Sequence, residues 1–344
     1  MSKWYIGAGE QNDIVISTRI RLARNIEDYP FPCKLDTKTR TALNKKIGDA
    51  VCGRENLEFI EMKTLTQPQI VSLAEKHLIS PEFASSYDGR ALLLSDSEGI
   101  SIMLCEEDHI KIQVMKPGLS LETAYAEADR IDDELNEKFV FAFDDRLGYL
   151  TQCPTNLGTG MRASVLLHLP ALTACGQMSS ISSTVSKLGL TVCGSYGEGS
   201  VPMGDIYCLS NQVTLGISEK AAIDNLKTVT LQLAAQERTA RAEMVKSIET
   251  EDEIFRAYGI LKSARILPVK EFMTLVSKVR LGAVAGFINV KPETVDELMI
   301  SMQPATINAA AGKNLDSRER DIERAKQVRP VSYTHLTLPT ILRV

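Results

Sequence analysis

The chain has 344 residues, of which 44% are hydrophobic and 24% charged, a balance typical of a globular protein long enough for two domains. Its net charge of −5 argues against a nucleic-acid partner, because counterion release at phosphates requires a basic face. No apolar run reaches the roughly 18 residues of a membrane helix and no signal peptide opens the chain. We therefore expect a cytoplasmic protein without a membrane partner.

Alternating hydrophobicity predicts a first strand near the start of the chain, with an apolar face made of Ile14, Ile16, Thr18, Ile20 and Leu22. Successive side chains of a strand point to opposite faces, so Arg19 and Arg21 project together from its other face. Two neighbouring guanidinium groups form a clamp suited to an anion. The alternative is a solvated edge strand that happens to carry basic residues.

Further elements follow without an internal repeat. Asp36 is placed to cap a helix, and Pro170 suits the first turn of another. Hairpin-like spacing and helical periodicity predict short strands over 57–62, 91–95, 100–104 and 110–115, and helices over 36–51, 68–77, 120–138 and 170–189.

Three consecutive acids, Glu106, Glu107 and Asp108, lead into the strand predicted over 110–115. Acidic clusters at strand ends are often turns or solvated corners. They are also where carboxylates bind a cationic substrate or accept its proton. A second carboxylate, Glu198, lies between two glycines in a segment that could close over a ligand.

Residues 153–162, CPTNLGTGMR, combine a cysteine, a turn-forming Pro-Thr-Asn, two glycines and an arginine. Glycines allow backbone N–H groups to approach an anion, and Arg162 adds a bidentate donor. We expect this positive environment to lower the pKa of the Cys153 thiol. The alternative is an ordinary glycine-rich turn. The seven cysteines are otherwise scattered and form no C-x-x-C pair, so neither a protein-held metal nor a disulfide framework is indicated.

From residue 219 onward the pattern is helical, which places a domain boundary near 220–245. We predict an α+β fold in which a mainly antiparallel sheet is flanked by helices and followed by an all-helical domain. The predicted division is 1–235 and 236–330. The helical part either buries surface in a homodimer or packs on the first domain. Residues 331–344 are β-prone and break the charged helical pattern, so we expect a non-native tail.

Taken together and in this order, the motifs resemble those of the phosphagen (guanidino) kinase family, and more narrowly of its protein arginine kinase branch. The segments that carry the resemblance are 17–21, 105–109, 153–162, 193–198 and 210–216, within a match from about residue 14 to 329. The first motif begins too early for the helical domain that precedes the catalytic lobe in metabolic members. The resemblance therefore implies ATP-dependent phosphorylation of arginine side chains in proteins, with Mg²⁺ on the nucleotide.

The resemblance assigns roles to individual residues. Glu107 corresponds to the catalytic base, Glu198 to a second carboxylate against the guanidinium, and Cys153 to a reactive cysteine beside the substrate. The nucleotide-binding positions that it implies are Ser17, Thr18, Arg19, Ile20, Arg21, His77, Lys111, Arg162, Ala163, Ser164, Val165, Leu166, Cys193, Gly194, Ser195, Tyr196 and Gly197.

A final motif lies in the helical domain. In the protein arginine kinases an R-D-x-x-R-A sequence binds phosphoarginine allosterically, and the matching positions are Arg320, Asp321, Ile322, Glu323, Arg324 and Ala325. Without the resemblance, this segment reads as a solvent-facing helix with i,i+3 and i,i+4 charge pairs. Further partners that the resemblance implies are arginine-bearing protein substrates, a zinc-binding activator protein and a Clp-type protease.

Three positions depart from the family pattern: Cys105 stands for asparagine, and Lys111 and Cys193 each stand for arginine. Lys111 keeps the charge without the bidentate fork. Loss of a phosphate-clamping arginine at Cys193 could reduce turnover by about 10³–10⁵. Two alternatives therefore stay open, a weakened regulatory adaptor that binds phosphoarginine and a metabolic kinase for a small guanidine.

Overall fold

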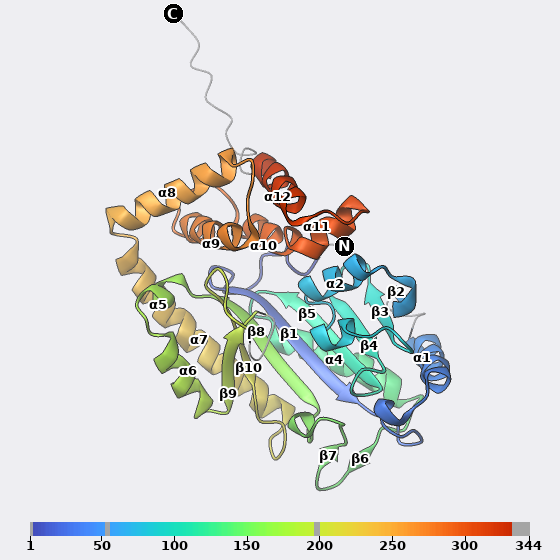
Figure 1. Ribbon diagram of the computed structural model, residues 1–344. Helices are drawn as coiled ribbons and strands as arrows, with labels where there is room; N and C mark the ends of the chain where they lie inside the picture. Colours follow the sequence, from blue (N-terminus) through green and yellow to red (C-terminus); the bar gives the residue numbers. More distant parts are fainter. Residues whose placement is uncertain (1–2, 52–55, 196–199, 332–344) are drawn as a thin grey trace, which may run out of the picture.

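The computed structural model describes residues 3–51, 56–195 and 200–331. Its centre is an eight-stranded antiparallel sheet in the order β2-β3-β4-β5-β1-β8-β10-β9 (Figure 1). Strand β1 (Val15–Arg24) lies in the middle, between β5 (Ile110–Pro117) and β8 (Met161–His168). The predicted first strand and the predicted antiparallel sheet are confirmed.

One face of this sheet is covered by helices α1 (Thr37–Val51), α4 (Leu121–Asn136) and α7 (Glu219–Met244). Ile20 and Leu22 are fully buried in the core that these helices form with the sheet. Asp36 caps α1, since its Oδ1 accepts the Thr39 N–H at 2.7 Å. The apolar side of β1 therefore anchors the sheet, which leaves Arg19 and Arg21 on the opposite face.

The remaining elements extend the sheet and pack around it. The other strands are β2 (Leu57–Glu61), β3 (Ala91–Ser95), β4 (Ile100–Leu104), β9 (Leu190–Gly194) and β10 (Ile206–Asn211), with a separate hairpin of β6 (Phe143–Asp144) and β7 (Gly148–Tyr149). The shorter helices of this part are α2 (Gln67–Glu75), α3 (Pro81–Ala84), α5 (Pro170–Ala174) and α6 (Met178–Ser186), with 3-10 turns at Pro32–Lys34, Met62–Thr64 and Pro154–Asn156.

Two predicted helices differ from the observed ones. The helix predicted over 170–189 is two helices, because Gly176 adopts a left-handed φ of 67° between α5 and α6. The helix predicted to reach His77 ends at Glu75, and His77 itself has a φ of 60°. Both breaks depend on single backbone conformations that hydrophobic periodicity does not report.

A second core forms in the C-terminal helices, which lie together above the sheet in Figure 1. They are α8 (Ile248–Ser263), α9 (Val269–Val284), α10 (Pro292–Ser301), α11 (Pro304–Ala311) and α12 (Ser317–Val331). Helix α7 belongs to the sheet core through Ile223, Leu226 and Leu233. No helix in the described ranges is long and apolar enough to cross a membrane.

A buried polar network joins the two parts. Arg280 of α9 is fully buried, and its Nε lies 2.7 Å from Oδ1 of Asp296 on α10. The same guanidinium donates to the Asn12 carbonyl at 2.8 Å and contacts Nδ1 of His168, at the end of β8, at 3.3 Å. Burial, followed by the charge of Arg280, lowers the pKa of His168 well below its ordinary value, so the imidazole is neutral.

We predict that Arg280→Ala lowers the free energy of unfolding by about 3–5 kcal/mol, because it leaves the Asp296 carboxylate buried and unpaired. Urea unfolding followed by circular dichroism measures the change. Arg256→Ala, which removes an exposed ion pair with Asp252, is the matched control and should leave the midpoint unchanged. Equal midpoints for the two variants would show that the network does not hold the two parts together.

Candidate active site

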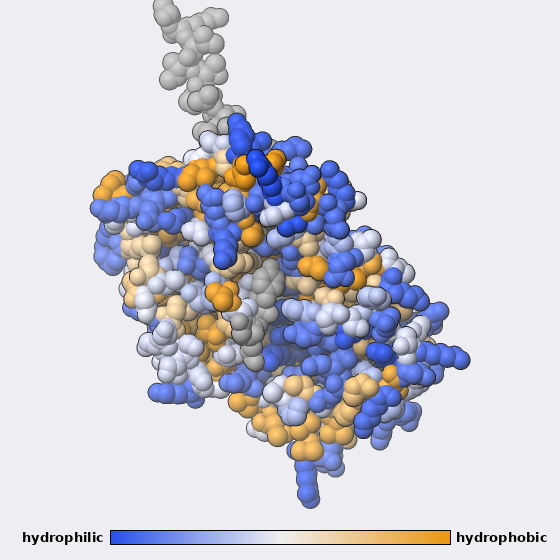
Figure 2. Space-filling model, in the orientation of Figure 1, coloured by the Kyte–Doolittle hydropathy of each residue, from blue (hydrophilic) through white to orange (hydrophobic). Residues whose placement is uncertain are grey.

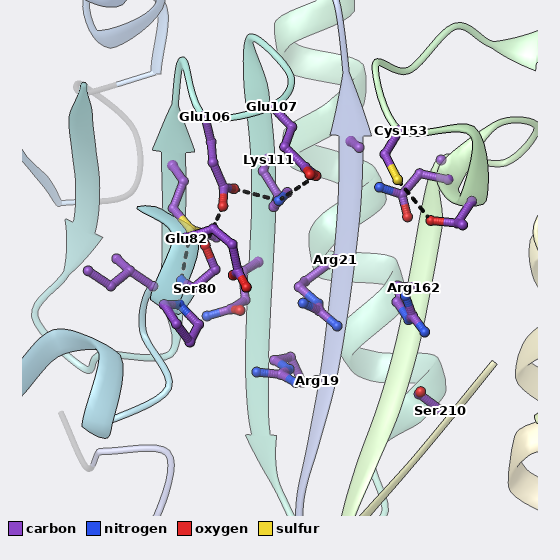
Figure 3. Close-up of a pocket in the computed structure, with 18 of the residues that line it drawn as sticks. Arg19, Arg21, Ser80, Glu82, Glu106, Glu107, Lys111, Cys153, Arg162 and Ser210 are labelled. Atoms are coloured by element: carbon purple, nitrogen blue, oxygen red, sulfur yellow. Dashed lines mark hydrogen bonds and ion pairs between the residues drawn. The ribbon is translucent and has the colours of Figure 1, made fainter. Parts of the chain in front are cut away.

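A cavity of about 320 Å³ opens on the sheet face that the helices leave uncovered. Figure 2 shows it as a hollow floored by hydrophilic side chains, and Figure 3 shows 18 of the residues that line it. Its walls come from β1, β5 and β8 and from the segments that contain Ser80 and Cys153. Several segments that the sequence separates by more than a hundred residues therefore meet at one site.

One wall of the cavity is basic. Arg19 and Arg21 extend from β1, and Arg162 of β8 lies directly opposite Arg21 in the strand register (Figure 3). Arg19 Nε donates to Ser164 Oγ at 3.3 Å, whereas Arg21 Nε is buried without a hydrogen-bond partner. Burial, followed by the charges of Arg19 and Arg162, lowers the pKa of Arg21 to about 9. Like charges directly opposite each other are destabilising. This wall is therefore suited to an anion that neutralises several guanidinium groups at once.

The opposite wall is acidic. Glu106 is buried, and its carboxylate accepts hydrogen bonds from the Ser80 hydroxyl and, at 2.5 Å, from Lys111 Nζ. The Glu107 carboxylate is only half buried, lies 3.8 Å from Lys111 Nζ and lines the cavity (Figure 3). Desolvation raises the pKa of Glu107 above its ordinary value, although Lys111 opposes the shift. Glu107 is therefore the carboxylate that is available to a ligand.

Lys111 was expected among the phosphate-binding cations. Its ammonium group bonds Glu106 at 2.5 Å and approaches Glu107, on the acidic side of the cavity. The positive charge of Lys111 therefore neutralises mainly the buried carboxylate of Glu106. Glu106 and Ser80 are site residues whose individual roles the sequence did not reveal, because their contacts join segments 26 positions apart.

Cys153 lines the same cavity from the far side of β1 (Figure 3). It is half buried, and its Sγ lies 3.0 Å from the Thr155 hydroxyl. The glycines of this segment have a packing role that differs from the expected approach to an anion. Gly160 has a φ of 61°, and a Cβ there would lie 2.7 Å from the Ala23 carbonyl oxygen of β1.

A smaller adjoining hollow contains several of the expected nucleotide-binding residues. Ser17, Arg19, His77, Ser164, Leu166 and Ser195 line it, together with Met115 and Cys208. Burial, followed by the charge of Arg19, lowers the pKa of His77 to about 3, so the imidazole is neutral. A neutral ring can accept or donate a hydrogen bond beside the arginines without adding a further cation.

The other expected residues divide into three groups. Ile20, Ala163 and Val165 are buried in the core on the helix side of the sheet, and Thr18 Oγ1 donates to the Gly118 carbonyl at 2.7 Å. These side chains build the sheet, so only their backbone could reach a ligand in the cavity. Cys193 lines the main cavity, and Gly194 is buried beside Ser200. Tyr196, Gly197 and Glu198 lie outside the described residues.

The expected phosphoarginine motif lies on α12, away from the cavity (Figure 1). Arg324 is buried, and its guanidinium donates to the Leu267 carbonyl at 2.7 Å, to the Met302 carbonyl at 2.8 Å and to Asp321 Oδ1 at 2.6 Å. Arg320 donates to the Leu315 carbonyl at 2.7 Å. Ala325 is buried, whereas Ile322 is exposed. Arg324 therefore ties α12 to the two neighbouring loops, a role that the motif alone does not show.

Comparison with known proteins agrees with this architecture. Residues 38–240 match the model of the ATP:guanido phosphotransferase C-terminal catalytic domain, and residues 247–333 match that of the protein-arginine kinase McsB C-terminal domain. A protein-arginine kinase of Caldanaerobacter subterraneus subsp. tengcongensis is 45% identical, with 92% of this chain and 96% of that protein covered. One from Halothermothrix orenii is also 45% identical, with 96% of each chain covered.

Among solved structures, a lombricine kinase aligns with a TM-score of 0.60 and 25% identity and covers 69% of each chain. A duplicated taurocyamine kinase from Schistosoma mansoni aligns with a TM-score of 0.59 and 26% identity, and covers 77% of this chain and 40% of that one. The fold is thus that of a guanidino phosphotransferase. The chain belongs to the ATP:guanido phosphotransferase family and, within it, to the protein-arginine kinases.

We predict that Lys111→Met destabilises the fold by about 3–5 kcal/mol, because it strands the buried Glu106 carboxylate without its cation. Lys111→Arg should restore most of the loss, since it returns the charge. The free energy of unfolding from urea titration is the measurement. Adding Glu106→Gln to the Lys111→Met variant should also recover stability, and an undiminished loss in the double variant would contradict this pairing.

Proposed function

We propose that this protein transfers the γ-phosphoryl group of ATP to arginine side chains of other proteins, with the reaction taking place in the sheet cavity. The observation that carries the proposal is the cavity's division into two walls of opposite charge. Arg19, Arg21 and Arg162 face it from β1 and β8, and Glu107 faces it from the turn before β5. A triphosphate suits the basic wall, and a guanidinium suits the acidic one.

The first chemical requirement is removal of a proton from the substrate. A guanidinium has a pKa above about 12, so its nitrogen becomes nucleophilic only as a proton leaves. Glu107 is positioned to accept that proton, and desolvation raises its pKa and hence its basicity. The new N–P bond forms as the bond between the γ-phosphorus and the β,γ-bridging oxygen breaks, which yields a phosphoramidate and ADP.

The second requirement is stabilisation of the transferring group. Phosphoryl transfer passes through a loose transition state, so alignment and charge neutralisation supply most of the catalysis. The fixed arginines of β1 and β8 supply cations that need no rearrangement, because both strands are central in the sheet. Mg²⁺, in this proposal, is carried by the ATP phosphates, where it neutralises developing charge. Mg²⁺ is commonly held by substrate phosphates together with waters and one or two carboxylates, so this placement needs no dedicated protein cage.

The identity of the substrate rests on the relatives. The named relatives are protein-arginine kinases, and residues 247–333 match the C-terminal domain characteristic of them. We propose that 1–235 is the catalytic domain and 236–330 the regulatory and dimerising one. Protein targets with exposed arginines, a zinc-binding activator, a Clp-type protease and a cytoplasmic location complete this proposal.

We predict that Glu107→Gln reduces phosphoryl transfer by about 10²–10⁴ while ATP binding stays intact, because an amide cannot accept the guanidinium proton. Formation of an acid-labile phosphoramidate from labelled ATP and an arginine-rich protein measures transfer, and calorimetry measures ATP binding. In the parent, kcat/KM should fall as the pH drops through the raised pKa of Glu107, above its ordinary 4.5.

The exposed Glu122→Gln variant is the matched control for this experiment, since Glu122 pairs with Lys227 outside the cavity. It should transfer phosphate at the parental rate. Unchanged turnover in Glu107→Gln would remove Glu107 from the mechanism. Free arginine as the better acceptor would instead favour a metabolic kinase.

A second candidate function is favoured by Cys193, which stands where the family has an arginine and lines the cavity beside Arg162. Here the chain is an adaptor that binds phosphoarginine on α12 and turns over ATP weakly. We predict that free phosphoarginine gives binding heat with the parent and at least tenfold weaker binding with Arg320→Ala, because a bidentate donor to the phosphate is lost. Lys326→Ala on the same helix is the control. Absence of heat with the parent would exclude the adaptor.

A further inference from the structure

Cys193 and Cys208 lie directly opposite each other in the antiparallel ladder of β9 and β10. Cys193 Sγ donates to the Cys208 carbonyl oxygen at 3.6 Å, and each thiol shifts the pKa of the other. Residues directly opposite in such a ladder have Cα atoms about 4.5–5.5 Å apart. Disulfides span Cα separations of about 4.4–6.8 Å, so these two positions can be bridged without moving the strands.

The pair lies inside the phosphate-binding part of the site, since both residues line the main cavity with Arg19 and Arg162. The hydrogen bond from Cys193, followed by the charges of Arg19 and Arg21, lowers the pKa of the Cys208 thiol to about 6 against the opposing effect of burial. The same hydrogen bond raises the pKa of Cys193. The neighbouring arginines therefore favour the thiolate at Cys208 over the thiolate at Cys193.

The other described cysteines lack this arrangement. Cys33 and Cys175 are exposed, and Cys153 has a hydroxyl neighbour, Thr155, in place of a thiol. Burial raises the pKa of Cys105 to about 12, which keeps it protonated. Of the cysteines in the described ranges, only Cys193 and Cys208 combine a facing thiol with a cationic cavity.

We propose that Cys193 and Cys208 form a redox-active dithiol, which a hydroperoxide oxidises to an intramolecular disulfide within the ATP site. The Cys208 thiolate attacks one peroxide oxygen, the O–O bond breaks, and Cys208 becomes a sulfenic acid. The second peroxide oxygen leaves as hydroxide, which takes up the proton that the Cys208 thiol had released and becomes water. The Cys193 sulfur then attacks the Cys208 sulfur, and water leaves with the Cys193 proton. In total, two thiols lose two electrons and two protons, and hydrogen peroxide is reduced to two molecules of water.

Bound ATP should protect the pair, and this part of the inference rests on the proposed function. The nucleotide phosphates and the Cys208 thiolate compete for the same arginines, so phosphate binding disfavours the thiolate. A repulsion of about 1.4 kcal/mol raises the pKa of the thiol by about one unit, which at neutral pH lowers the thiolate fraction, and with it the rate of oxidation, about twofold. The nucleotide also fills the route by which the peroxide enters the cavity.

Mass spectrometry of the full chain treated with hydrogen peroxide tests the proposal. Lys187 and Lys220 bound a segment without lysine or arginine, so trypsin releases both cysteines in the single peptide 188–220. Oxidation should make this peptide about 2 Da lighter, through loss of two hydrogens, and a dithiol reductant should reverse the change. Saturating Mg·ATP should slow its formation by about twofold or more, since the nucleotide also fills the cavity.

Cysteine variants separate the outcomes. Cys193→Ser should abolish the lighter peptide and leave a sulfenic acid on Cys208 that dimedone traps, whereas Cys33→Ser should oxidise as the parent does. A peptide that stays reduced, or gains only oxygen, while calorimetry shows normal ATP binding would overturn the dithiol. A disulfide that forms equally fast with and without ATP would support the dithiol and contradict the placement of the nucleotide.

Discussion

Three guanidinium groups held side by side on the two central strands are the constraint on which the site depends. Arg19, Arg21 and Arg162 repel one another, and burial adds to the difficulty of keeping them charged. The sheet can hold them because the other face of β1 is fixed in the core by Ile20 and Leu22. The apolar burial on one face of the sheet thus offsets the repulsion between the guanidinium groups on the other face. An anionic ligand would relieve that strain, which is the physical basis for proposing that phosphate binds here.

The acidic wall must likewise accommodate neighbouring groups of like charge, in this case two adjacent carboxylates. Two adjacent carboxylates beside one cation would be poorly neutralised if both were buried. The structure buries Glu106 against Lys111 and Ser80 and leaves Glu107 half exposed at the cavity. One acid therefore stabilises the fold, while its neighbour stays available as a base. Separate environments thus give the adjacent glutamates different exposure and different partners.

Sequence patterns predicted what depends on local periodicity. The alternation along 14–22 predicted β1 and the side on which Arg19 and Arg21 lie, and Asp36 predicted the start of α1. Features that depend on distant contacts escaped prediction. Lys111 Nζ reaches Glu106 only because the turn before β5 reverses the chain. Glycine is needed at position 160 because the backbone of β1 lies too close for a side chain there. The facing thiols of Cys193 and Cys208 likewise require the β9–β10 register, since fourteen residues separate them in the sequence.

The same register explains how the cavity accommodates a thiol where an arginine is usual. An arginine at position 193 would add another guanidinium near Arg19 and Arg162, beside the Cys208 thiol that those charges already activate. With Cys193 in its place, the cavity has less positive charge, and the Cys208 thiolate offsets part of what remains. A phosphate group that binds must then compete with that thiolate for the positive charge of the arginines. If the nucleotide binds as proposed, its affinity and the thiol chemistry are linked through one set of charges, so a change in one should alter the other.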